Sequence, residues 1–336
     1  MLRKTGLLWL VVTVSAFWVG NSIARVTHYT AATTQVKGHD ITIWSKPTDD
    51  TGIGRIVAGP AQTLWFGELA KGTVVRFSLA GTAAPFTVPS SGAKIYALAP
   101  GQHGQMWFAD FNSNKAGLTT KKGRFQLFDL SISGPSQSTE MVEGAAGAHW
   151  FGTANSGIGR ITADGQSTFF SLQDNASYPT ALTVGPDNEI WFAEWKGPNV
   201  GYVDPSGTVH EFAAGFGSNS NTFGIAYGSD GRIWFCDPQN LRIGALNTDG
   251  TGLTFYQKHL TGMPDTIVAG PDGNLYFGEF NGAIGMITVS GNITEFPLPI
   301  DKGSFPVLAM TVGPDGQIWF SNFNHAQVGQ LRIDGQ

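Results

Sequence analysis

A ten-residue pattern with an aromatic pair at its centre recurs along this chain, and it constrains the fold more than any other feature. The copy at residues 270–279 reads GPDGNLYFGE. The aromatic pair occurs at Trp65-Phe66, Trp107-Phe108, Trp150-Phe151, Trp191-Phe192, Trp234-Phe235, Tyr276-Phe277 and Trp319-Phe320. By subtraction of these positions, successive pairs lie 42, 43, 41, 43, 42 and 43 residues apart. A constant period of about 40 to 45 residues is typical of the blades of a β-propeller, each of which contains several short strands.

Each repeat carries four strand signals that are separated by tight turns. In the sixth repeat the strand signals are residues 266–269, 274–277, 283–287 and 292–296. Asp272-Gly273 and Ser290-Gly291 supply turns, because Gly adopts positive φ without strain and Asp caps nearby backbone groups. The chain has 45 glycines and only 13% charged residues, which suits many short strands better than amphipathic helices. We therefore predict an all-β fold, a seven-bladed β-propeller of four-stranded antiparallel blades.

The seventh repeat shows only three strand signals, the third of them at Val328–Ile333, before the last residue, Gln336. A segment that precedes the first repeat, Ile41–Trp44, has the composition of the missing strand and matches Ile293–Phe296. We predict that this N-terminal strand closes the last blade, which would remove two exposed sheet edges. Residues 37–336 are then one propeller domain, since each repeat packs only against its neighbours.

The N-terminus has the layout of a secretory signal peptide. Arg3 and Lys4 precede an apolar run, Leu7–Gly20, and small residues follow at Ser22 and Ala24. The run is shorter than the roughly 20 residues that cross a bilayer as a helix, although an uncleaved anchor is the alternative. We expect residues 1–24 to be a signal peptide, residues 25–36 to be a flexible leader, and the protein to be exported to the periplasm or the extracellular medium.

Charge and cysteine content exclude several classes of function. Removal of Arg3 and Lys4 changes the formal net charge from −5 to −7, so no basic surface for nucleic acid or anionic lipid is expected. We expect a monomer that has no membrane contact after cleavage. The single cysteine, Cys236, stands where the other repeats have Gly, Ala or Ser, and therefore reads as a small buried residue rather than a nucleophile.

Acidic residues recur two positions after the Phe of the aromatic pair. In an antiparallel meander this position lies on the same face as the loops that lead into the first strands, around the central channel. Five repeats carry a carboxylate there, namely Glu68, Asp110, Glu194, Asp237 and Glu279. A ring of carboxylates could bind a divalent cation. The alternative is that each acid caps backbone N–H groups in its own blade, which would explain why it recurs.

The loops that lead into the first strands provide the second set of candidates. Five residues before the first Gly of each pattern, the chain has Gly54, Tyr96, Thr139, Thr180, Phe223, Asp265 and Leu308. Asp265 is the only acid of this set, and with Glu279 it could form a catalytic carboxylate pair. The aromatic residues Tyr96, Tyr178, Phe223 and Phe305 are predicted to bind a small-molecule ligand at the mouth of the channel.

Three segments carry a resemblance to a known family: residues 190–194 (IWFAE), 156–161 (SGIGRI) and 293–299 (ITEFPLP). They resemble the repeat of the virginiamycin B lyase (streptogramin lyase) family, and the resemblance extends over residues 38–336. It implies a seven-bladed propeller that opens a cyclic depsipeptide antibiotic at its ester by elimination, without water. It also implies catalytic histidines and a magnesium ion held by glutamates.

The resemblance does not extend to the catalytic residues. The histidines of the family follow a proline before the first strand of late blades, where this chain has Asp265 and either Val307 or Leu308. Phe305 stands where the last blade of the family has a glutamate. Two classes of function therefore stay open. One is a lyase or hydrolase with a rearranged site that contains Asp265, Glu279, Glu194 and Tyr178. The other is a non-catalytic propeller that binds a ligand or a protein on the same face.

Overall fold

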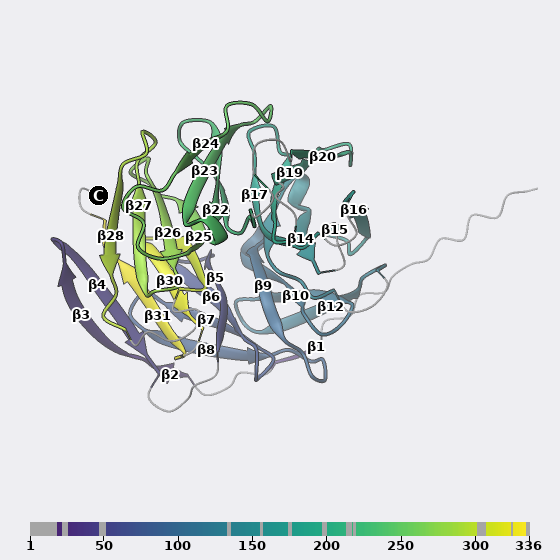
Figure 1. Ribbon diagram of the computed structural model, residues 1–336. Coiled ribbons are helices and arrows are strands. Elements are labelled where there is room, and N and C mark those ends of the chain that lie inside the picture. Colours follow the sequence, from purple (N-terminus) through teal and green to yellow (C-terminus); the bar gives the residue numbers. More distant parts are fainter. Residues whose placement is uncertain are drawn as a thin grey trace, which may run out of the picture.

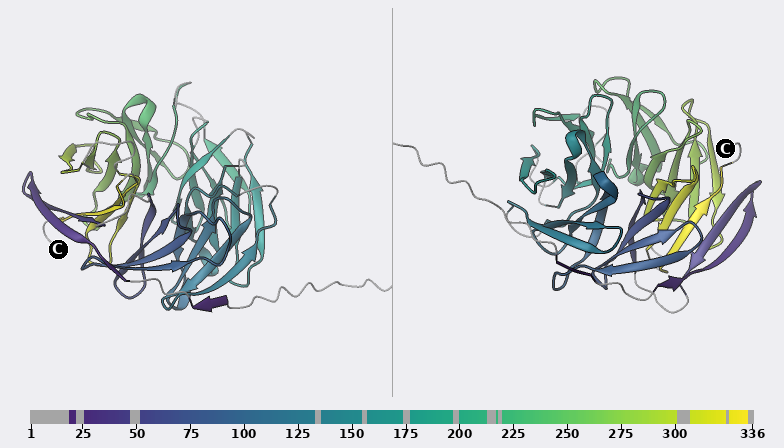
Figure 2. Two further views of the ribbon diagram at one scale, coloured as in Figure 1. Left: turned by 90° about the horizontal axis from the view of Figure 1, so that it is seen from below. Right: turned by 180° about the vertical axis from the view of Figure 1, so that it is seen from behind.

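The computed structural model shows seven antiparallel sheets arranged around a common axis (Figures 1 and 2). It describes residues 19–21, 26–46, 52–132, 136–154, 157–173, 177–196, 200–212, 217, 220–300, 307–323 and 325–333. Each sheet contains the strands of one sequence repeat in meander order. The prediction of an all-β, seven-bladed propeller with four-stranded antiparallel blades is confirmed.

The strands of the first six blades follow one another along the chain, and the innermost strand of each comes first. Their bounds are: β5 (Ile53–Gly59), β6 (Thr63–Glu68), β7 (Thr73–Ser78) and β8 (Thr82–Thr87); β9 (Ile95–Pro100), β10 (Gln105–Asp110), β11 (Lys115–Thr120) and β12 (Arg124–Asp129); β13 (Met141–Glu143), β14 (His149–Thr153), β15 (Gly157–Ile161) and β16 (Ser167–Ser171); β17 (Pro179–Val184), β18 (Ile190–Glu194), β19 (Val200–Val203) and β20 (Val209–Phe212); β21 (Ile225–Tyr227), β22 (Arg232–Asp237), β23 (Arg242–Asn247) and β24 (Thr254–Tyr256); β25 (Pro264–Ala269), β26 (Leu275–Glu279), β27 (Ala283–Ile287) and β28 (Ile293–Pro297).

The seventh sheet combines the two ends of the described chain. It contains β29 (Ala309–Val312), β30 (Ile318–Asn322) and β31 (Gln327–Leu331), followed by β4 (His39–Ser45) and β3 (Thr30–Val36). Strand β4 is antiparallel to β31, with Ile41 opposite Leu331. In both views of Figure 2, β3 (purple) lies at the outer edge of the ring.

Strand β3 differs from the sequence interpretation of residues 25–36 as a flexible leader. Thr30–Val36 pairs with β4 residue by residue, from Thr30 opposite Ser45 to Val36 opposite His39. The turn between them is Lys37-Gly38, and both residues have positive φ, 49° and 86°. Two-residue hairpins require this conformation, because it matches the twist of the paired strands. The turn and the β-branched threonines thus extend the sheet beyond the expected domain boundary.

Most of the predicted signal peptide lies outside the described residues, which omit 1–18 and 22–25. Within 1–24 the structure describes only the strand β1 (Val19–Asn21), which is antiparallel to β12. A further short strand, β2 (Thr27–His28), extends the first blade beside β8. Among the described residues, no helix has the length and apolar character needed to span a membrane.

The recurring aromatic pair forms the packing between and within blades. Trp107 is buried and stacks on Phe128 of the fourth strand in its blade, with ring centroids 5.4 Å apart. In the second to the seventh blade the Phe of the pair covers a glycine in the third strand, whereas Phe66 of the first blade lies opposite Val75. In the sixth blade, a Cβ atom on Gly285 would lie only 2.0 Å from Cζ of Phe277. The pattern is therefore mainly structural. Cys236 is buried beside it, and burial raises the pKa of its thiol well above the usual value.

Candidate functional site

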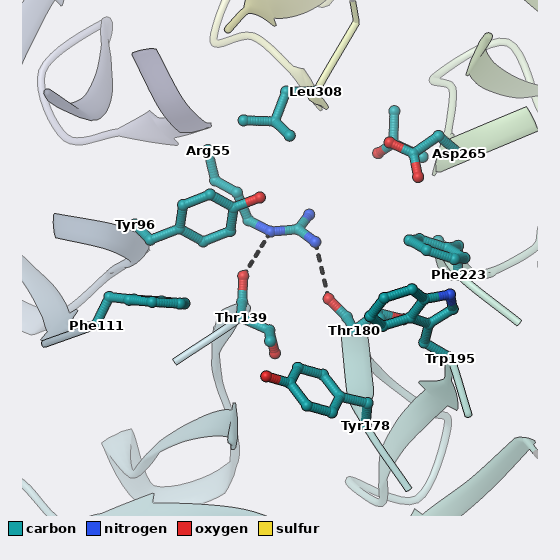
Figure 3. A pocket seen from close by; sticks show the side chains of 12 residues that line it. Arg55, Tyr96, Phe111, Thr139, Tyr178, Thr180, Trp195, Phe223, Asp265 and Leu308 are labelled. Atoms are coloured by element: carbon teal, nitrogen blue, oxygen red, sulfur yellow. Dashed lines mark hydrogen bonds between the residues drawn. The ribbon is translucent and has the colours of Figure 1, made fainter. Parts of the chain in front are cut away.

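A cavity of about 180 Å³ lies at one mouth of the central channel (Figure 3). All seven blades contribute to it, because their innermost strands surround the axis. Its lining consists of Arg55, Tyr96, Phe111, Thr139, Tyr178, Thr180, Trp195, Phe223, Gly224, Asp265, Thr266 and Leu308. The cavity therefore combines aromatic side chains with one guanidinium and one carboxyl group.

The residues that sequence spacing places before the first strands mostly converge in this cavity. Of that set, Tyr96, Thr139, Thr180, Phe223, Asp265 and Leu308 line it, and the predicted ligand-binding residue Tyr178 lies beside them. Phe305 lies outside the described residues. The first blade departs from the spacing, because Arg55 rather than Gly54 lines the cavity.

The residue that the spacing selects in the first blade, Gly54, has no side chain that could line the cavity. The pairing between β5 and β6 shifts register between Ile53 and Ile56, but the same one-residue shift occurs in the second, fourth and sixth blades, so it does not distinguish the first blade. Arg55 was missed because the sequence interpretation considered a single position in each repeat. One available signal was that Arg55 is the only charged residue of the segment IGRIVAG, which forms β5.

Arg55 reaches across the channel from the first blade to the third and fourth blades. Its Nε donates a hydrogen bond to the carbonyl oxygen of Thr139, and its Nη2 donates one to that of Thr180, both at 2.8 Å. Its Nη1 donates to Oε1 of Glu140 at 3.0 Å. Glu140 Oε2 in turn accepts a hydrogen bond of 2.8 Å from the backbone N–H of Leu182. These hydrogen bonds hold the positively charged guanidinium of Arg55 in the wall of the cavity.

Asp265 stands opposite Arg55 in Figure 3, and among the described residues it is the only one with a carboxyl group that lines the cavity. The residue is only 8% exposed, and within the described chain no donor hydrogen bonds to its carboxylate. Burial raises the pKa of Asp265 from 3.8 to about 7, although the charge of Arg55 opposes the shift. A carboxyl group with a pKa near neutrality can both take up and release a proton at physiological pH.

Two aromatic groups flank the polar residues. Trp195 contacts Tyr178 edge-on, with ring centroids 5.8 Å apart, and also lies 6.0 Å from Phe223. Tyr96 and Phe111 form the other group, at 6.2 Å. Trp195 is 42% exposed, which is unusual for a residue of this size and leaves its ring accessible to a ligand. Trp195 and Phe111 were missed, yet each directly follows an acid of the predicted ring, Glu194 and Asp110.

The predicted ring of acids does not converge on the axis. Each of Glu68, Asp110, Glu194, Asp237 and Glu279 is buried at the end of the second strand in its blade, and none of them lines the cavity. Asp110 accepts hydrogen bonds from the backbone N–H groups of Lys94 and Asn112.

Two other acids of the ring bind side chains. Glu68 forms an ion pair of 2.7 Å with Lys46, and Asp237 forms one of 2.7 Å with Arg242. These three acids are therefore engaged locally, Asp110 and Asp237 within their own blades and Glu68 by a lysine that follows β4 of the seventh blade.

The geometry does not fit the magnesium ion that the resemblance implies. Across the described ranges, no three His, Cys, Asp or Glu side chains come together as ligands for a metal ion. The cavity itself holds one carboxyl group, Asp265, and the guanidinium of Arg55.

The proposed carboxylate pair is also not formed in the cavity. Glu279 is fully buried away from the lining, and its pKa responds to Glu295 rather than to Asp265. Glu279 lies opposite Pro264 in the pairing of β25 with β26, whereas Asp265, at the register shift between Pro264 and Thr266, lines the cavity.

Fold and cavity together define a seven-bladed β-propeller with an axial pocket built by all of its blades. Comparison with known proteins makes this more specific. The model of the virginiamycin B lyase family matches residues 11–217 and 216–336, and the chain belongs to this family.

Individual relatives support the same assignment. A virginiamycin B lyase of Nocardia farcinica is 27% identical over 198 residues, which are 48% of this chain and 70% of that protein. A streptogramin B lyase structure has a TM-score of 0.81 at 27% identity and covers 90% of this chain and 100% of its own. A catalytically inactive virginiamycin B lyase from Staphylococcus aureus with Quinupristin has a TM-score of 0.79 at 27% identity and covers 91% and 100%.

Proposed function

We propose that this protein binds a small molecule with aromatic groups in the axial cavity and breaks a C–O bond in it by elimination, with Asp265 as the general base. The observation that carries the proposal is the position of Asp265, a buried carboxyl group with a pKa of about 7 among aromatic side chains. Family membership supports the type of reaction. The N-terminal sequence supports export as the route by which the protein meets such a compound.

The reaction can be written with the groups that line the cavity. Asp265 takes the proton from the carbon next to a carbonyl group of the substrate. The electron pair of that C–H bond forms a C=C bond, and the ester C–O bond breaks so that a carboxylate departs. No water is consumed, so a cyclic ester gives a linear product of the same mass.

Arg55 is the second group in the proposed reaction. Negative charge develops on the substrate carbonyl oxygen as the proton leaves, and a fixed cation stabilises such charge. Nη1 and Nη2 of Arg55 each have a second N–H beyond those used for Glu140 and Thr180. The three contacts of Arg55 with the protein hold the guanidinium in place, so no reorganisation is needed during the reaction. No magnesium ion is part of this proposal.

A streptogramin B depsipeptide such as Quinupristin, the compound in the structure of the Staphylococcus aureus relative, is the probe for the test. The protein is incubated with it in the presence of a chelator, and the products are analysed by mass and ultraviolet spectrum. We expect a linear isomer, formed at least about 100-fold more slowly by Asp265→Asn. The matched control is Asp249→Asn in an exposed turn, which should react at the wild-type rate. Absence of the isomer, while an active lyase converts the same sample, would refute the reaction.

A non-catalytic binding propeller is the second candidate, because no histidine lines the cavity among the described residues. It predicts that the depsipeptide quenches the fluorescence of the exposed Trp195 without forming any product. Trp195→Phe should then remove most of the quenching. Binding without conversion would support this candidate against the first.

A further inference from the structure

A second cavity, of about 280 Å³, lies further along the central channel than the axial cavity. The two cavities are lined by different parts of the same innermost strands. In β17, Thr180 near the start of the strand lines the axial cavity and Leu182 lines the second one. In β25, Asp265 lines the axial cavity and residues 267–269 line the second one. The channel therefore contains two cavities in series.

The ion pair of Arg55 and Glu140 lies between the two cavities. Arg55 lines the axial cavity and not the second one, whereas Glu140 lines the second cavity and not the axial one. The two side chains are in direct contact, because Nη1 of Arg55 donates a hydrogen bond of 3.0 Å to Oε1 of Glu140. The side chain of Glu140 is still 23% exposed. Among the described residues that line the second cavity, Glu140 is the only charged one.

The carboxylate of Glu140 can accept further hydrogen bonds. Its Oε1 accepts one from Arg55, and its Oε2 accepts one of 2.8 Å from the backbone N–H of Leu182. A carboxylate has about four acceptor positions, so about two remain. Burial raises the pKa of Glu140 although the charge of Arg55 lowers it, so Arg55 does not fully compensate for the burial of this carboxylate. A second cation in the second cavity would complete the compensation.

The remaining wall of the second cavity is mostly apolar, with side chains from Leu182, Ile225, Ile267, Val268 and Met310. Such a wall favours an alkyl group over a hydrated ion. An apolar cavity of about 150 Å³ holds one benzene molecule, so this one has room for a ligand of about seven to ten heavy atoms. A calcium ion does not fit the wall, because it requires about six to eight oxygen ligands and the cavity provides one carboxylate.

We propose that the second cavity binds an organic ammonium ion, namely a primary amine that carries an alkyl group of about six carbon atoms. Its ammonium group donates hydrogen bonds to the remaining acceptor positions of Glu140, and its alkyl group contacts the apolar wall, including Val268 and Met310. The site is separate from the axial cavity and does not depend on the proposed reaction.

The test is isothermal titration calorimetry of the full chain with hexylamine at about pH 7.5, where a primary amine is charged. Hexanol is the matched ligand without charge. We expect one site for hexylamine with a dissociation constant of about 1 mM or lower, and at least about tenfold weaker binding of hexanol. The melting temperature should rise with the logarithm of the hexylamine concentration.

Two carboxyl-to-amide variants locate the site. Glu140→Gln should bind hexylamine at least about tenfold more weakly, because it removes the charge that the ammonium group pairs with. Asp265→Asn is the matched control, since it removes the carboxyl group of the axial cavity, and it should bind hexylamine as the wild type does. If Glu140→Gln fails to fold, Val268→Phe fills the second cavity, leaves both partners of the ion pair in place and should abolish binding.

Three results would overturn the proposal. One is the absence of both binding heat and a shift in melting temperature up to about 10 mM hexylamine. Another is equal binding of hexylamine and hexanol, which would show that Glu140 does not recognise the charge. The third is binding that Asp265→Asn abolishes while Glu140→Gln or Val268→Phe retains it, which would place the amine in the axial cavity.

Discussion

Replacement of Arg55 by Met should destabilise the propeller more than any exposed ion pair could. Arg55 joins the first blade to the third and fourth blades through three hydrogen bonds, to Thr139, Glu140 and Thr180. The variant keeps the apolar stem but leaves the carboxylate of Glu140 with only the N–H of Leu182. Removal of one partner from a buried ion pair costs about 3–5 kcal/mol, because the remaining charge is uncompensated. The side chains of Arg55 and Glu140 are 14% and 23% exposed, so we expect a loss at the lower end of this range, about 3 kcal/mol in the free energy of unfolding.

A double-mutant cycle separates this loss from simple packing effects. Glu140→Gln should cost less, about 1–3 kcal/mol, because Arg55 keeps both carbonyl acceptors. The double variant should be more stable than the sum of the two single losses predicts, by at least about 1.5 kcal/mol. Lys115→Met is the control, since its ion pair with Asp129 is exposed and should contribute less than about 1 kcal/mol.

The assay is equilibrium unfolding in urea, followed by tryptophan fluorescence and by circular dichroism. Agreement of the two signals establishes the two-state behaviour that the free energies require. A loss below about 1 kcal/mol for Arg55→Met, or simple additivity of the two single changes, would refute the buried bridge.

Three further predictions concern other parts of the fold and the cavity. The folded pKa of Asp265 is raised from 3.8 to about 7, so the wild type should lose stability as the pH rises through this interval, whereas Asp265→Asn should not. The difference between the melting temperature of Asp265→Asn and that of the wild type should therefore increase from pH 5 to pH 8 in scanning calorimetry. A difference that does not change with pH would contradict this prediction. Cys236 should resist alkylation in the folded protein at neutral pH and react only in urea, because its thiol is buried and the pKa of the thiol is raised. Mass spectrometry would detect the label, and rapid labelling of the native protein would contradict this prediction. Gly285→Ala should cost about 1–3 kcal/mol in urea unfolding, because the new Cβ meets the ring of Phe277, while a neutral result would show that the ring can move aside.

Local sequence signals predicted the architecture because each of them acts within one repeat. The Asp272-Gly273 turn joins two strands that are adjacent along the chain, and the Tyr276-Phe277 pair packs within its own blade and against the next one. These contacts recur with the period of the sequence, so seven copies predict seven blades. The interpretation of residues 25–36 was wrong for Thr30–Val36, because that strand belongs to no repeat and is recognisable only by its hairpin turn with β4.

Even spacing also predicted much of the cavity, including Tyr96, Phe223 and Asp265. It failed where a single position in each repeat was too narrow a choice. Arg55 directly follows Gly54, which the spacing selects in the first blade, and Trp195 and Phe111 directly follow acids of the other set. A one-residue register shift recurs beside these positions in the first, second, fourth and sixth blades, so it belongs to the repeat and does not explain the difference.

The sequence by itself determined the number of blades, the order of their strands and the face on which the polar residues gather, because periodicity and turn chemistry are local. Only the tertiary structure decided which of those residues meet. Arg55 lies 84 and 125 residues from Thr139 and Thr180, whose carbonyl groups it binds. Closure of the ring brings polar groups from distant parts of the chain together around the axis, and burial there shifts the pKa of a group such as the Asp265 carboxyl. The chemistry of the site therefore follows from distances that the linear repeat does not contain.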